Sequence, residues 1–427
     1  MGRVRLLLFL FIFWFNAYSG LVASMIMPSS DRIIRTMVVG LDGLMVLMAL
    51  LTVFKSRNFY GVRLAGLFVL SVALTMIYSS DRFGLLEQFN GLRETLFFFA
   101  SLIVVHSIYV SDKRDSFIKW MTISLIVFAI AQTPASFYQF LKYGAGDLVG
   151  GTYGIRGGSG YISQGLFIIC FYFIVRYASL EDESHFRIMR MVPFLAILIP
   201  CALNETKVSF LLLGVFLVLL VASRRQVYRA IPLLLVGLIL ALLLNYYYSE
   251  TVGDTRTIFD EQYVERYLYS NTTETGGDLP RFQRVTLMFK MMGNDVGAIL
   301  FGLGYGVLGG GNVMDVSRLG RTIYYLVTGS RILLFRVWIQ GGLLSVLLVG
   351  GAMFAFVRSY GDLTHTRKQF GRFIAFSLVV IWFYNEAMLD RTFAMMVWFF
   401  IIWLTYGEEE TPAHLSEDGT ALEHTSQ

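Results

Sequence analysis

The sequence predicts an all-α polytopic membrane protein with about twelve transmembrane helices and one long extracytoplasmic loop. First, 56% of the residues are hydrophobic and 15% are charged, and the mean hydropathy of +0.62 exceeds that of ordinary globular domains. Second, the apolar residues form continuous runs of about 20 residues, the length of a bilayer-spanning helix. Third, a single long polar stretch, residues 248–332, interrupts these runs.

Four regions follow from this pattern. Residues 1–247 hold the predicted spans 5–27, 36–54, 63–79, 95–111, 117–137, 161–179, 187–203, 207–222 and 230–247. Residues 248–332 form the large loop, and residues 333–406 hold the spans 333–357, 373–387 and 391–406. Residues 407–427 are acidic and polar, which predicts a disordered tail. The first run has the basic flank of a signal peptide, but its length and the many spans after it favour a transmembrane helix.

Lys and Arg concentrate in one set of short connections, which the positive-inside rule assigns to the cytoplasm. These basic clusters lie near residues 3–5, 55–63, 113–119, 176–190, 224–229 and 358–372. Both termini are therefore expected in the cytoplasm, and the 248–332 loop outside. The net charge of +5 comes mainly from these flanks, whose natural partners are anionic membrane lipids rather than nucleic acid.

Two hairpins on the expected outer face each contain an Asn-Glu dipeptide. One reads NETK and holds Glu205 and Lys207, and the other reads NEAMLD and holds Glu386 and Asp390. Ionisable groups at the edge of the hydrocarbon are costly and indicate a site that faces a polar cavity. Turn residues that pair locally in the headgroup region would give the same pattern, so both interpretations stay open.

The large loop contains a predicted amphipathic helix at 281–292, preceded by Asp278 and Pro280 as start signals. At 100° per residue, Arg281 and Arg284 fall on the apolar side of this helix. A guanidinium there needs a counterion, and its planar fork suits a phosphate or a carboxylate. The pattern therefore predicts either a phosphate-binding pair or a structural ion pair.

Two glycine-rich loops face the same side. The first, FGLGYGVLGGGN, begins at residue 301 and includes Gly302, Gly304 and Gly306. Its backbone N–H groups could form a weak anion nest, or the loop could simply be flexible. No strand-helix-strand unit surrounds it, which excludes a dinucleotide fingerprint. The second loop, residues 143–161, carries Arg156 among its glycines.

Together these features resemble the O-antigen ligase and polymerase superfamily. The resemblance lies in the many spans, one long outer loop, arginines followed by FGLGYG, and a later span that opens GGLLSVLLVGG. It covers about residues 1–406 through short motifs. It implies a GT-C-like membrane glycosyltransferase in the bacterial inner membrane. Such an enzyme joins undecaprenyl-pyrophosphate-linked oligosaccharides into O-antigen, capsule or exopolysaccharide, with a flippase and a chain-length regulator as partners.

The resemblance also implies roles for individual arginines. Arg281 and Arg284 match the arginines expected to engage the pyrophosphate, and Arg156 and Arg331 are weaker matches. The ligase branch is expected to carry a histidine late in the long loop. Here that segment reads LVTGSRILLFR, without histidine, which favours a polymerase over a ligase.

The chemistry expected outside the cell agrees with a polymerase. Nucleoside triphosphates are absent there, so a lipid-linked sugar pyrophosphate must supply the activated donor, and no cofactor or metal is required. Glu205 is the first candidate for the general base, followed by Glu386 and Asp390, and Lys207 is expected to help hold phosphate. A flippase for the same lipid-linked sugars is the alternative from another functional class.

Overall fold

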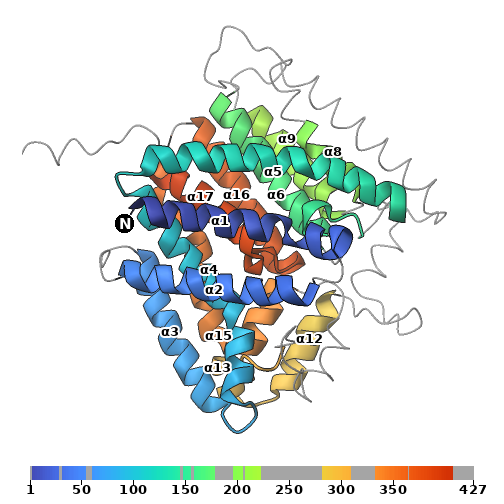
Figure 1. Ribbon diagram of the computed structural model, residues 1–427. Coiled ribbons are helices and arrows are strands. Elements are labelled where there is room, and N and C mark those ends of the chain that lie inside the picture. The colour runs from blue at the N-terminus through green and yellow to red at the C-terminus, as the bar shows by residue number, and fades with distance from the viewer. Residues whose placement is uncertain are drawn as a thin grey trace, which may run out of the picture.

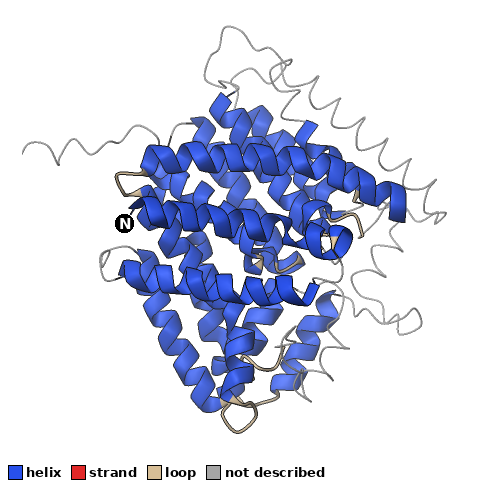
Figure 2. Ribbon diagram, in the orientation of Figure 1, coloured by secondary structure: helices blue, strands red, loops and turns tan. Residues whose placement is uncertain are grey.

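The computed structural model describes residues 2–27, 31–53, 60–144, 148–154, 158–177, 196–204, 207–222, 281–308, 332–363 and 365–406. These residues form helices and connections, with no β-strand in the described part (Figure 2). Among the described residues, seven helices are long and apolar enough to cross a membrane: Gly2–Ile26, Asp31–Val53, Tyr60–Tyr78, Leu85–Tyr109, Arg114–Tyr143, Ser159–Arg176 and Leu333–Arg358. The all-α membrane class is thereby confirmed. The count of about twelve stays a prediction, because the span expected at 230–247 and most of that at 187–203 lie outside the described residues.

The helices follow the predicted order. In the first part of the chain they are α1 (Gly2–Leu21), α2 (Asp31–Val53), α3 (Tyr60–Tyr78), α4 (Leu85–Tyr109), α5 (Arg114–Tyr143), α6 (Ser159–Tyr177), α8 (Ile199–Leu203) and α9 (Lys207–Ala222). In the second part they are α12 (Arg281–Met292), α13 (Val296–Phe301), α15 (Leu333–Phe354), α16 (His365–Tyr384) and α17 (Arg391–Tyr406). Figure 1 shows α1, α2 and α5 lying across the front of the molecule, with α4, α6 and α17 behind them.

The centre of the bundle is α17, which is buried from Thr392 to Leu404. Its sequence is apolar on every side, the pattern of a helix enclosed by other helices. The one polar group of Trp398 is satisfied, because its indole N–H donates to the carbonyl of Phe98 on α4 at 3.0 Å. Helices α2 and α3 instead leave large apolar side chains such as Leu50 and Leu70 exposed, as expected of helices that face lipid.

Helix α15 is broken at Gly342, where φ is 68° and ψ is −170°. The break frees the carbonyls of Ile339 and Gln340, which accept hydrogen bonds from the backbone N–H groups of Leu303 and Gly304 at 2.7 and 3.2 Å. The 301–306 loop thus fills the gap in α15. This contact fixes the first half of α15 in place.

Two glutamines inside α5 hold the second glycine-rich loop. Gln139 accepts from the backbone N–H of Gly151 at 2.7 Å and donates to its carbonyl at 2.8 Å. Gln132 accepts from the N–H of Thr152 at 2.9 Å and donates to its hydroxyl at 2.7 Å. These bonds satisfy the buried amides and draw the loop, with Tyr153, into the bundle.

Candidate functional site

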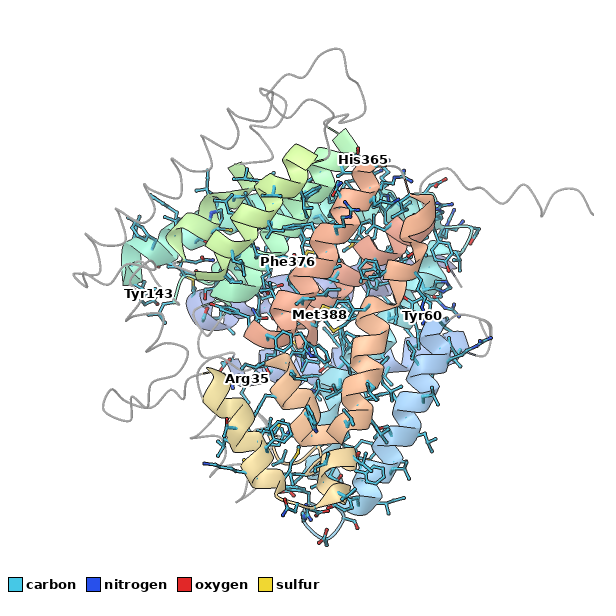
Figure 3. All side chains as sticks on the ribbon, turned by 180° about the vertical axis from the view of Figure 1, so that it is seen from behind. Arg35, Tyr60, Tyr143, His365, Phe376 and Met388 are labelled. Carbon is cyan, nitrogen blue, oxygen red and sulfur yellow. The ribbon has the colours of Figure 1, made fainter. Side chains whose placement is uncertain are left out.

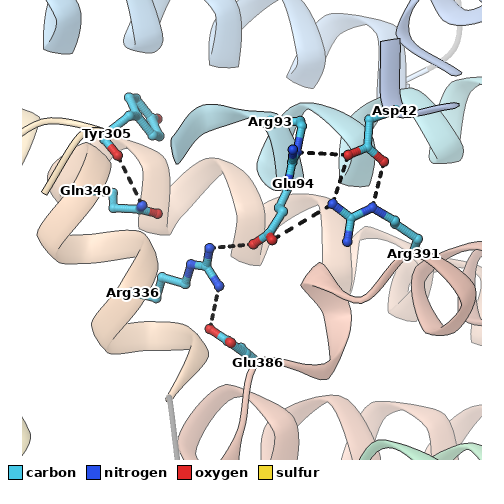
Figure 4. A network of polar contacts seen from close by, with 8 residues as sticks. All are labelled: Asp42, Arg93, Glu94, Tyr305, Arg336, Gln340, Glu386 and Arg391. Carbon is cyan, nitrogen blue, oxygen red and sulfur yellow. Dashed lines mark hydrogen bonds and ion pairs between the residues drawn. The ribbon is translucent and has the colours of Figure 1, made fainter. Parts of the chain in front are cut away.

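A chain of six charged side chains, alternating in sign, lies inside the bundle (Figure 4). In order along the contacts it runs Arg93, Asp42, Arg391, Glu94, Arg336 and Glu386. The members come from α2, α4, α15, the start of α17 and the hairpin before α17. Three guanidiniums and three carboxylates make the chain formally neutral. It therefore joins both halves of the sequence without leaving a net charge in the interior.

Asp42 lies between Arg93 and Arg391 in this charge chain and is only 1% exposed. Its Oδ1 lies 2.6 Å from Nε of Arg391 and its Oδ2 lies 2.8 Å from Nη2 of the same residue. Oδ2 also lies 2.9 Å from Nε of Arg93. The paired contact with Arg391 is the bidentate geometry in which guanidinium and carboxylate bind most strongly. This arrangement explains how an aspartate can lie in the middle of an apolar helix.

Glu94 connects Arg391 with Arg336 in the charge chain. One carboxylate oxygen pairs with Arg336, and the other lies 3.9 Å from Nη2 of Arg391. Arg336 in turn donates from Nη1 to Oε2 of Glu386 at 2.7 Å. The Glu94 side chain keeps 24% of its surface exposed, against 7% for Arg336. The charge chain is therefore most accessible along α4.

Charges inside a membrane protein are expensive, and by default they indicate a functional site. Removing one member of a buried pair typically costs about 3–5 kcal/mol, because the partner is left uncompensated. The charge chain also has a structural effect, since it ties the early helices to α15 and α17.

Within the described part of the chain, no group of three or more His, Cys, Asp or Glu is arranged to hold a metal ion.

Asp390 lies beside the charge chain, immediately before Arg391. Its Oδ1 accepts the backbone N–H of Phe393 at 2.9 Å and so caps the start of α17. The Tyr153 hydroxyl also hydrogen-bonds to this carboxylate. Desolvation by the surrounding protein raises the pKa of Asp390, although Phe393, Arg391 and Tyr153 act in the opposite direction. The result is a carboxylate that is more basic than an ordinary aspartate.

The hairpin that carries Glu386 is fixed by its neighbour Asn385. The Asn385 amide donates to Oε1 of Gln164 at 3.0 Å, and its own oxygen accepts the N–H of Ala387 at 3.0 Å. The carbonyl of Asn385 accepts the N–H of Leu333 at 2.9 Å. Residues 385–390 are thereby held against α6 and α15, and Met388 of this hairpin, labelled near the middle of Figure 3, is fully buried.

The asparagine of the other Asn-Glu dipeptide is held by the same helix. The Asn204 amide donates to the carbonyl of Ser159 at 3.0 Å and to the hydroxyl of Ser163 at 2.8 Å. Asn204 is fully buried. Both hairpins identified in the sequence therefore rest on the first two turns of α6. Glu205, which follows Asn204, lies outside the described residues.

Two of the predicted site residues, Glu386 and Asp390, are brought to the charge chain. The predicted glycines lie elsewhere, in the loop that fills the break in α15. The backbone N–H of Gly302 donates to Ala298 at 2.9 Å and that of Gly304 donates to Gln340 at 3.2 Å. An anion nest needs free N–H groups, so these contacts give Gly302 and Gly304 a packing role, and Gly306 packs against Phe83.

The helix predicted at 281–292 is confirmed as α12. Its expected apolar face points inward, since Met288 and Met292 are buried and Lys290 is exposed. Arg281 and Arg284 lie in its first turn, but their side chains are outside the described part. The same holds for the side chain of Lys207 at the start of α9. Arg156 and Arg331 lie outside the described residues altogether.

Most of the charge chain was not predicted from the sequence; the residues concerned are Asp42, Arg93, Glu94, Arg336 and Arg391. A signal for them exists in the sequence, because each lies inside a predicted span or within two residues of its start. Ionisable residues at such positions indicate a site.

Comparison of this chain with models of known families, with curated proteins and with solved structures found no match.

Proposed function

We propose that this protein is a membrane-embedded, GT-C-like polymerase. It joins undecaprenyl-pyrophosphate-linked oligosaccharide repeat units into a surface polysaccharide on the outer face of the bacterial inner membrane. One observation carries the proposal: a buried chain of alternating charges lies beside Asp390, at the end of the bundle where α6, α15 and α17 begin. The positive-inside orientation assigns that end to the outside.

The reaction needs two kinds of group that this region can supply. A hydroxyl of the acceptor attacks the anomeric carbon of the donor sugar, and a C–O glycosidic bond forms. The bond from that carbon to the phosphate oxygen breaks, and undecaprenyl pyrophosphate departs with the electron pair. A base must take the hydroxyl proton, and cationic donors must stabilise the negative charge that develops on the leaving group.

Asp390 is the described residue best suited to act as the base. Its raised pKa makes it a better proton acceptor than an ordinary aspartate. Glu386 is less suited, because Arg336 donates a charge-assisted hydrogen bond to it at 2.7 Å. Glu205, the first candidate from the sequence, remains a hypothesis for the same role.

The cations for the pyrophosphate come, in this proposal, from outside the charge chain. Arg336 and Arg391 are each paired with carboxylates and hold the site together. Arg281 and Arg284 are the expected pyrophosphate ligands, in keeping with their place on the apolar side of the predicted helix. Arg156, Arg331 and Lys207 are secondary candidates for the same task.

A flippase for lipid-linked sugars is the second candidate, because buried ionisable residues also line transport paths. A ligase is the third. The glycans of a deletion strain separate the three functions. We expect single repeat units in place of long chains. Loss of all surface units would indicate a flippase, and long chains retained on the lipid carrier would indicate a ligase.

A further inference from the structure

Gln164 on α6 carries a side-chain amide whose N–H groups have no acceptor among the described residues, although the residue is fully buried. Its orientation is forced by its neighbours. The Asn385 oxygen accepts the N–H of Ala387, so Asn385 can offer only its NH2 group to Gln164. Gln164 must therefore accept this hydrogen bond through Oε1. Its Nε2 group then has two N–H donors without an acceptor among the described residues.

A second unused donor occurs at the same turn. Arg336 is 6% exposed, and its Nη1 and Nη2 hold Glu386 and Glu94. Its Nε has no acceptor among the residues that the structure describes. Gln164 contacts Asn385 and Arg336 contacts Glu386, so both donors belong to side chains that hold consecutive residues of one turn. Buried donors are rarely left unpaired in native proteins, so an acceptor from outside the described residues is expected here, and a bound ligand is one source of it.

The charges around the turn decide what kind of acceptor fits. Because the charge chain is formally neutral, a phosphate would have to displace a carboxylate before it met a free guanidinium. A hydroxyl oxygen can accept from Gln164 and from Nε of Arg336 while the ion pairs stay intact. A hydroxyl can also donate its own proton to a carboxylate, and Asp390 lies in the same hairpin.

We propose that Gln164 and Arg336 form an acceptor subsite, in which the Gln164 amide and the Arg336 Nε–H donate hydrogen bonds to hydroxyl oxygens of the incoming saccharide. The subsite rests on the proposed polymerase function and adds to it the place where the acceptor binds. It assigns Gln164 a binding role that the sequence analysis did not consider.

The test uses the full chain in lipid nanodiscs and two probes measured by calorimetry. One probe is the repeat-unit oligosaccharide released from its lipid and free of phosphate, and the other is inorganic pyrophosphate. Gln164→Glu keeps the oxygen that accepts from Asn385 and removes the N–H donors. We expect it to bind the oligosaccharide about tenfold more weakly, equivalent to about 1.4 kcal/mol, with pyrophosphate binding unchanged.

Two further variants complete the test. Gln164→Met, similar in size and without N–H groups, should show the same loss, and it replaces Gln164→Glu if the buried carboxylate lowers the yield. Ser377→Ala is the matched control. The Ser377 hydroxyl is also buried without a partner among the described residues, but it lies on α16, about two turns before the 385–390 hairpin. It should bind both probes like the wild type.

The outcomes separate this inference from the proposed function. Wild-type oligosaccharide affinity in both Gln164 variants would overturn the subsite and leave the polymerase proposal standing. Weaker pyrophosphate binding with unchanged oligosaccharide binding would also overturn it, because the donors would then serve a phosphate. A wild-type protein that binds neither probe would overturn the subsite together with the polymerase proposal.

Discussion

Asp42 shows how a single buried carboxylate depends on its partners. Replacing it with Ala leaves the guanidiniums of Arg93 and Arg391 without this acceptor, and removal of such a partner typically costs about 3–5 kcal/mol. We expect Asp42→Ala to lower the midpoint of heat-induced aggregation and the yield of monodisperse protein.

The matched control is Asp31→Ala at the start of the same helix. Asp31 pairs with Arg35 at 2.5 Å on a partly exposed surface, where an ion pair is worth about 0–1 kcal/mol. Similar midpoints for the two variants would contradict the importance of the charge chain for stability.

Asp390→Asn tests the proposed base with little change in structure. The Asn oxygen can still accept from Phe393 and cap α17, so the amount of inserted protein should not change. Loss of a general base typically lowers a rate by about a hundredfold or more. The readout is the initial rate of chain elongation per inserted molecule. A rate within twofold of the wild type would exclude Asp390 as the base.

The pH dependence of the wild-type rate provides a second readout at this residue. A base acts only when deprotonated, so activity should fall as the pH decreases through the pKa of Asp390. Because desolvation raises that pKa, the fall should occur at higher pH than for an ordinary aspartate, whose pKa is about 3.9.

The sequence identifies candidate residues where the signal is local, and it does not identify those whose partners are distant in the chain. Glu386 and Asp390 were predicted because a charged hairpin between apolar runs is visible in the chain. Asp42 and Arg391 are 349 residues apart, and nothing in either segment identifies the other as its partner. Only the packing of α2 against α4 and of α4 against α17 brings them together.

At the scale of elements, the break in α15 depends on Gly342. Its φ and ψ fall in a region that is essentially restricted to glycine, and a Cβ there would lie 2.1 Å from the carbonyl oxygen of Leu300. Such backbone strain costs on the order of 1–3 kcal/mol before the clash is added. We expect Gly342→Ala to lower thermal stability and the yield of inserted protein.

Gly350 on the same helix is the matched control. A Cβ there would meet only the Trp382 ring, at an ordinary 3.7 Å. Since Ala favours a helix over Gly by about 1 kcal/mol, Gly350→Ala should be as stable as the wild type or slightly more stable. Wild-type stability of Gly342→Ala would show that the contact between α15 and the 301–306 loop is dispensable.

Helix boundaries show which elements the sequence could predict. The span expected at 95–111 begins ten residues earlier, because α4 starts at Leu85. Its first turns contain Gln88, Arg93 and Glu94, which lowered the local hydropathy and hid the helix. In the structure Gln88 accepts from Ser79 at 2.9 Å and the two charged residues join the charge chain. A helix turn whose polar residues are paired within the protein is therefore not recognised from hydropathy alone.

At the scale of the whole molecule, the orientation of the bundle decides whether the charge chain can reach substrates outside the cell. Asp81 lies exposed between α3 and α4, and Asp112 lies exposed between α4 and α5. A cysteine at residue 81 should react with a membrane-impermeant maleimide in intact cells, and one at residue 112 should react only after lysis. Background should be low, because Cys170 and Cys201 are buried. The reverse pattern would contradict the orientation.

The central claim is that this protein itself joins lipid-linked repeat units on the outer face of the membrane. The most direct test supplies purified protein in liposomes with undecaprenyl-pyrophosphate-linked repeat units, EDTA and no nucleotide, and measures product length by gel electrophoresis. We predict a ladder of extended chains that remain on the lipid carrier, and no ladder from Asp390→Asn. Repeat units that stay single with the wild-type protein, while the same preparation moves them across the bilayer, would contradict the claim and favour a flippase.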